Sequence, residues 1–241
     1  MAGISEKLEG YSARAASRIG YARLLVWKDL LFHPDETLAR EMGNASLGRA
    51  AKDLFVASYA FFLADSIYIG FVFGAVALFF LMAGGAGGMQ VSGSVLTLVA
   101  AIAGAVLALV LGSALLAALS VASNFIWAGI EFALARMLGG KGEYAQHAYL
   151  GALAMSAYYV VSMPMMLLSM IPCLGYAFSM ISIAIAAYLL YVRYKAIRLV
   201  HGIGQMEAVF VTVAPSAVLV LLFVALYVLV FLGFFTAGLW L

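Results

Sequence analysis

Asp65 is an acidic residue inside a long apolar stretch, with Tyr68 one helical turn later on the same face. A carboxyl group in hydrocarbon costs roughly 2.5–3.5 kcal/mol on insertion scales, so it is expected to face the interior of a helix bundle. Two kinds of chemistry fit this position. Asp65 either binds a proton, a cation or a polar substrate, or joins two helices through a hydrogen bond.

Asn124 and Glu131 are two further polar residues that belong to one helical face, since they are seven positions apart. We expect them to line a polar cavity near one membrane boundary, with Glu131 meeting Arg136 or Arg198. Together with Asp65 and Tyr68 they form the predicted intramembrane polar site.

Small residues recur at intervals of four or seven positions in the first two apolar segments. This spacing allows close approach of helix backbones, so helix packing is favoured over a binding role. The residues expected to take part in helix packing are Ser66, Gly70, Gly74, Ser113, Ser120 and Pro164.

Metal-dependent and hydrolytic chemistry finds little support in the sequence. His33, His147 and His201 are 114 and 54 residues apart, whereas metal ligands are commonly closely spaced pairs. Motifs such as HExxH and GxSG, and a pair of acids in facing spans, are missing. The sequence therefore predicts no catalytic residue, no cofactor and no metal site.

The composition is typical of a membrane protein. The chain has 241 residues, of which 66% are hydrophobic and 10% charged, and its mean hydropathy is +1.10. Soluble domains carry about 25% charged residues, so too few charges are present to cover a water-facing surface. This excludes a soluble enzyme, a disordered tail and a nucleic-acid-binding module.

Three long segments, 66–130, 148–192 and 208–241, carry no formal charge. A helix needs about 20 apolar residues to cross the hydrocarbon core, so these segments hold several crossings. Glycine and serine at 84–94 and Pro172 divide the first two. The prediction is an all-α integral membrane protein with transmembrane helices at 54–83, 95–130, 148–170, 173–192 and 208–241.

The basic residues predict the orientation. Of the 13 Lys and Arg residues, eight precede the first span, two lie between the second and third, and three lie between the fourth and fifth. With five spans every cation falls on one side, which the positive-inside rule makes the cytoplasm. The N-terminus is then inside and the C-terminus outside.

Residues 1–53 form a predicted cytoplasmic head of amphipathic helices. Basic residues alternate there with apolar ones, and a new helix is expected to begin at Pro34 and to close at Gly43. The first helical segment lies in the lipid headgroup region or packs on the cytoplasmic face of the bundle. The residues predicted to contact lipid or a partner are Arg14, Arg18, Arg23, Trp27, Lys28, Arg193, Lys195, Arg198 and His201.

The order of several short segments resembles the Yip family (Ypt-interacting-protein, or Yip-one, domain) of five-span membrane proteins. The segments are 30–38 with Leu-Leu-Phe-His-Pro, 137–144 with Met-Leu-Gly-Gly-Lys-Gly-Glu-Tyr, the tyrosine-to-proline segment 156–164, and 195–202, which ends in His-Gly. The resemblance covers roughly residues 30–235. Asp53-Leu54 is not followed by the Gly-Pro of eukaryotic members, and the long polar tail is missing, so the chain is similar to short prokaryotic members.

The resemblance implies a non-enzymatic scaffold or adaptor in the cytoplasmic membrane of a prokaryote. It would organise lipids or protein partners, and eukaryotic relatives contact small Rab-type GTPases in membrane trafficking. Formation of a homo-oligomer is also expected. The competing hypothesis is a small transporter, channel or lipid-moving protein that uses Asp65.

Overall fold

The fold was obtained as a computed structural model, which describes residues 21–83, 95–169, 171 and 175–238. In this part of the chain all regular structure is helical. The helices are α2 (Tyr21–Phe32), α3 (Pro34–Met42), α4 (Leu47–Ala83), α5 (Val95–Met137), α6 (Tyr144–Leu168), α7 (Gly175–His201) and α8 (Gln205–Gly238).

Five of these helices, α4 to α8, are long and apolar enough to cross a membrane. The five predicted segments are therefore confirmed as helices, and the chain has the architecture of a multi-pass membrane protein. Each helix is longer than its predicted span at one end. The first begins at Leu47 and the second continues to Met137, because charged residues do not interrupt a helix that leaves the lipid.

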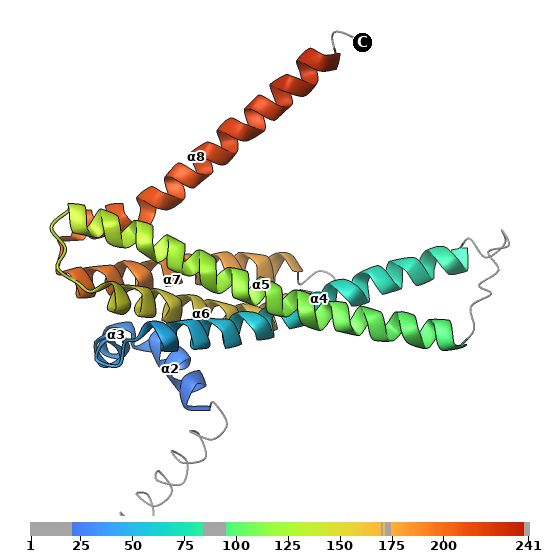
Figure 1. Cartoon of the computed structure of the whole chain (residues 1–241), viewed down its shortest axis with the longest axis horizontal. Helices are drawn as coiled ribbons and strands as arrows, with labels where there is room; N and C mark the ends of the chain where they lie inside the picture. Colours follow the sequence, from blue (N-terminus) through green and yellow to red (C-terminus); the bar gives the residue numbers. More distant parts are fainter. Residues whose placement is uncertain (1–20, 84–94, 170, 172–174, 239–241) are drawn as a thin grey trace, which may run out of the picture.

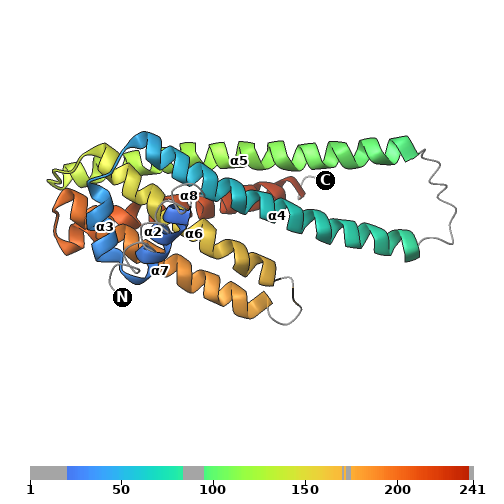
Figure 2. The same ribbon diagram turned by 90° about the horizontal axis from the view of Figure 1, so that it is seen from below.

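Helices α4 to α7 form a bundle, and α2 and α3 pack at one end of it (Figure 1). We call this the head end; α4 begins there and α5 and α7 end there (Figures 1 and 2). Helix α8 starts at the head end and projects away from the bundle. Helices α4 and α5 diverge from each other towards the ends that lie farthest from the head (Figure 2).

The apolar core is concentrated at the head end. Trp27 and Leu30 of α2 and Leu38 of α3 are buried against Leu54 of α4 and Leu153 of α6. The predicted helix at Pro34 is confirmed: α3 begins at this proline, and Gly43 follows its last residue. The short head helices thus share a core with the long ones.

The connection from α5 to α6, residues 138–143, packs tightly against the last turn of α7. Gly139 has a φ of 87°, in the left-handed region that favours glycine. A Cβ on Gly142 would lie 2.5 Å from the Val200 carbonyl oxygen, and the Lys141 amide donates to the His201 carbonyl at 3.1 Å. The glycine-rich segment near 140 and the segment ending at His201 are therefore one structural unit.

Substitution of Gly142 by alanine tests this packing. The new methyl group would collide with the Val200 backbone, so Gly142→Ala should lower the free energy of unfolding by about 1–3 kcal/mol. Gly112 is the matched control, since its Cβ position is open, and Gly112→Ala should raise the stability by about 0.5–1 kcal/mol. Denaturant titration in mixed micelles measures both. Equal effects of the two variants would contradict the proposed packing.

Candidate functional site

The candidate site is centred on the carboxylate of Glu131, which lies on α5 and is 1% exposed. Its Oε2 accepts a hydrogen bond from Arg193 Nε at 3.0 Å, and Arg193 Nη2 lies 2.9 Å from the same oxygen. His147 Nε2 of α6 is 3.3 Å from Oε2. The indole of Trp127 donates to Oε1 at 3.0 Å. One carboxylate therefore joins three helices, α5, α6 and α7.

Such an arrangement satisfies a buried charge with a paired charge and further donors. In a low-dielectric interior the attraction is strong only when both partners are present, and removing one leaves an unpaired buried charge. Gly151 of α6 lies beside the Arg193 guanidinium, and a Cβ there would be 3.8 Å from Nη2. A small residue at this position leaves room for the cation.

His147 and His201 extend the cluster towards the 138–143 connection. His201 Nε2 and His147 Nδ1 are 3.2 Å apart, and both side chains are buried. Phe132 packs against both rings. A chain of polar contacts therefore runs from Glu131 through His147 to His201. We expected His201 to contact lipid or a partner, but it lies inside the bundle and is 2% exposed.

A second polar cluster fixes the head to the bundle. Arg23 of α2 lies 3.2 Å from Glu41 of α3 and 3.0 Å from Asp53 of α4. Its Nη1 also donates to the Tyr149 hydroxyl of α6 at 3.2 Å, and this hydroxyl donates to Glu41 Oε2 at 2.5 Å. Four helices meet at this guanidinium.

The Arg23 guanidinium stays protonated in this setting. Burial alone lowers the pKa of the guanidinium, but the hydrogen bond to Tyr149 and the negative charges of Asp53 and Glu41 raise the pKa above its ordinary value. Arg23 therefore remains a cation among two acids and a phenol. The sequence predicts that Arg23 contacts lipid or a partner; in the structure its side chain is 25% exposed and pairs within the chain.

A third set of contacts joins the head to α7. Lys195 Nζ lies 2.6 Å from Asp35 of α3 and also packs over the Tyr191 ring. The Tyr188 hydroxyl donates to the Leu31 carbonyl of α2 at 2.7 Å. The Lys195 pair is the more exposed of the clusters, so solvent screens it more strongly.

The residues of the predicted intramembrane polar site do not form one cluster. Asp65 and Tyr68 of α4 are half-buried, and no described residue forms a hydrogen bond or ion pair with Asp65. Asn124 is buried and its amide nitrogen has no partner among the described residues. Glu131 pairs with Arg193, whereas Arg198 is exposed. The predicted partners Arg136 and Arg198 were therefore wrong.

The predicted packing residues fall into two groups. Ser66 and Ser113 are 3.2 Å apart across α4 and α5, and the Ser120 hydroxyl lies 2.8 Å from the Tyr159 hydroxyl of α6. The others are exposed. Around Gly70 and Gly74 no other described element comes within 4 Å of the position that a Cβ would take, and Pro164 is exposed within α6. Divergence of α4 from α5 explains the exposed glycines.

The remaining residues predicted to contact lipid or a partner are distributed between surface and interior. Trp27 is buried in the core, while Lys28 and Arg198 are exposed. Arg14 and Arg18 lie outside the described residues.

Sequence reasoning missed the three partners of Arg23, which are Glu41, Asp53 and Tyr149, and two groups around Glu131, which are Trp127 and His147. No spacing in the sequence distinguishes these residues from the charged and aromatic residues near them. Arg23 is distant in the sequence from its partners, and only tertiary packing brings them together.

The site holds a buried ion pair and a connected set of polar side chains. Among the described residues, no group of three or more His, Cys, Asp or Glu is arranged to hold a metal ion. Comparisons with protein-family models, with curated proteins and with solved structures find no match to the chain.

Removal of the central carboxylate tests the role of the Glu131 cluster. Glu131→Leu leaves Arg193 buried without its counter-ion, so it should lower the free energy of unfolding by about 3–5 kcal/mol. Replacing both charges, in Glu131→Leu/Arg193→Met, should recover most of this loss. The control Asp35→Ala breaks an exposed pair and should cost at most about 1 kcal/mol. Denaturant titration in micelles measures these changes. A double variant as unstable as Glu131→Leu alone would contradict the pairing of Glu131 with Arg193.

Proposed function

We propose that the chain is a non-enzymatic membrane scaffold or adaptor, similar in kind to the Yip family. In this proposal the head end faces the cytoplasm and the C-terminus lies outside, in the cytoplasmic membrane of a prokaryote. The distribution of cations supports the orientation, since the charge clusters around Arg23 and Arg193 and the Lys195 pair all belong to the head end. The head end would bind membrane lipids or other membrane-associated proteins.

The observation that carries this proposal is the bridging position of Arg23. Its contacts with Glu41, Asp53 and Tyr149 attach α2 and α3 to the long helices at several points. A head that is attached in this way presents a fixed surface, whereas a tethered tail would sample many orientations. A fixed surface suits the recognition of a partner without a large ordering cost.

The surface presented by the head combines apolar and basic groups. Phe32 is 69% exposed, Leu24 and Leu25 are exposed on the same helix, and Lys28 adds a positive charge. The buried Trp27 and Leu30 attach the opposite side of α2 to the core. Helix α2 therefore packs on the bundle and still offers apolar side chains to lipid headgroups or a protein. Packing on the bundle and contact with the lipid surface do not exclude each other for this helix.

Site-specific crosslinking at Phe32 tests the scaffold proposal. A photoreactive phenylalanine analogue at Phe32 should yield discrete protein or lipid adducts in native membranes, because this side chain is exposed on the proposed recognition surface. The same analogue at Tyr176, which is 88% exposed at the far end of α7, is the control. Absence of adducts at Phe32, or identical adducts at both positions, would argue against a recognition surface on the head.

A second function rests on the isolated carboxyl of Asp65. The neighbouring Ser66 forms a hydrogen bond with Ser113 of α5, but Asp65 has no polar partner among the described residues. A half-buried acid that does not join helices in the described structure favours a role in binding a proton, a cation or a polar substrate. The alternative is therefore a small transporter, channel or lipid-moving protein that uses Asp65.

Flux measurements separate this alternative from the scaffold. If Asp65 carries transport, vesicles reconstituted with the purified chain should show proton or cation flux that Asp65→Asn abolishes, because the amide cannot take up a charge. Asp35→Asn, which changes an exposed acid of the head, should leave the flux intact. Equal flux in Asp65→Asn and the unaltered chain would eliminate the transport role.

A further inference from the structure

A pocket of about 270 Å³ lies between α4, α5, α6 and α7 beside the Glu131 cluster. Its wall is partly polar, with Ser120 and Asn124 from α5 and Arg193 from α7. Leu54 of α4 and Met155 of α6 supply apolar surface. The pocket is large enough for a small polar group with a few carbon atoms.

One hydrogen-bond donor at this pocket lacks an acceptor. The Asn124 amide nitrogen is buried and has no partner in the described structure, and the residue as a whole is 7% exposed. Arg193 Nη2, by contrast, lies 2.9 Å from the Glu131 carboxylate and belongs to that ion pair. Buried donors are almost always satisfied in folded proteins. The Asn124 amide therefore indicates a ligand that brings an oxygen acceptor.

The charges around the pocket decide what kind of acceptor fits. Arg193 is already neutralised by Glu131, whose Oε2 accepts from Arg193 Nε at 3.0 Å. An anionic ligand beside Arg193 would also lie close to the Glu131 carboxylate and would be repelled by it. His147, the other titratable group at this carboxylate, is 3.3 Å from the same oxygen. A neutral acceptor such as an ester carbonyl therefore fits better than a phosphate or a free carboxylate.

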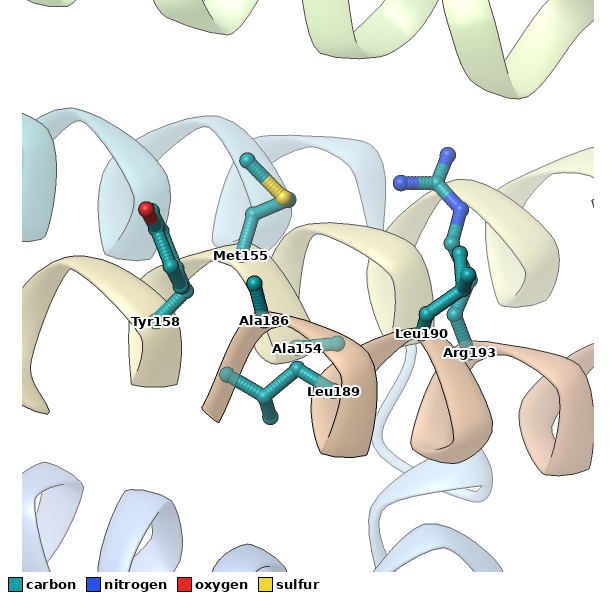
Figure 3. A pocket seen from close by; sticks show the side chains of 7 residues that line it. All are labelled: Ala154, Met155, Tyr158, Ala186, Leu189, Leu190 and Arg193. Atoms are coloured by element: carbon teal, nitrogen blue, oxygen red, sulfur yellow. The ribbon is translucent and has the colours of Figure 1, made fainter. Parts of the chain in front are cut away.

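An apolar groove of about 200 Å³ adjoins the pocket and shares Met155 and Arg193 with it. Figure 3 shows Arg193 at one end of this groove, with Ala186 and Leu189 of α7 and Tyr158 of α6 along it. The groove follows α7 over the seven helical steps from Arg193 to Ala186, which is about 10 Å along the helix axis. Its length and lining suit part of a hydrocarbon chain.

The position of the pocket along the helices matches a membrane boundary. Glu131 and Arg193 directly follow the predicted hydrophobic spans 95–130 and 173–192. The groove leads from Arg193 into the span of α7. A lipid bound there would have its polar end at the boundary and its chain in the hydrocarbon layer, in the same direction as the surrounding lipids.

We infer that this pocket and groove bind a neutral acyl ester of a membrane glycerolipid. An ester oxygen accepts a hydrogen bond from Asn124, and the acyl chain occupies the groove between α6 and α7. This site is separate from the exposed surface of the head, so it goes beyond the proposed scaffold function. It makes the chain a specific lipid binder, whatever its partner at the head.

Equilibrium binding of radiolabelled 1-monooleoylglycerol to the purified full chain in detergent tests the inference. Asn124→Leu removes a donor and should weaken binding about five- to tenfold. Ala186→Phe fills the groove and should weaken binding at least tenfold. Ala187→Phe is the matched control: its residue is exposed like Ala186 but does not line the groove, so binding should be unchanged.

Two further probes identify the recognised chemistry. Oleate carries an anionic head and octadecene has no acceptor, so both should bind at least tenfold more weakly than the ester. Octadecene binding as tightly as the ester, or tighter binding of oleate, would overturn the assignment. Unchanged binding in Asn124→Leu, or equal losses in Ala186→Phe and Ala187→Phe, would also overturn it. No partner is present in this assay, so its failure leaves the scaffold proposal standing.

Discussion

The free-energy cost of placing an unpaired charge in hydrocarbon governs this structure. A buried charge is tolerated only when it is paired and its remaining hydrogen-bonding positions are filled. Glu131 meets this condition through Arg193, His147 and Trp127, which belong to three helices. The pairing specifies how α5, α6 and α7 are rotated about their axes, because any other rotation would leave the carboxylate alone.

Helix α6 connects this cluster to the head. His147 and Tyr149 are two residues apart and so point to nearly opposite sides of α6. His147 faces the Glu131 carboxylate, and Tyr149 faces Arg23 and Glu41 in the head. The packing of the long helices and the docking of α2 and α3 therefore depend on the same turn of α6. The head end is therefore a single structural unit.

The sequence predicted the elements well and their mutual contacts poorly. Length and hydrophobicity are local properties, so the five spans and the start of α3 at Pro34 followed directly from the residues. The partner of Glu131 did not, because Arg193 and Arg198 are five residues apart and project about 140° from each other around α7. Only the rotation of α7 in the bundle decides between them. The need for glycine at position 142 was hidden for the same reason, since it depends on contact with the distant Val200.

The functions proposed for the head require that the charged head end lies on the cytoplasmic side of the membrane. Labelling of single cysteines with a membrane-impermeant maleimide in intact cells, in a chain with Cys173 replaced by serine, tests this most directly. A cysteine at Ser92, between the first two spans, should be labelled from outside. One at Lys141, beside the last turn of α7, should react only after the membrane is permeabilised. Labelling of Lys141→Cys in intact cells would contradict the orientation and the functions proposed for the head.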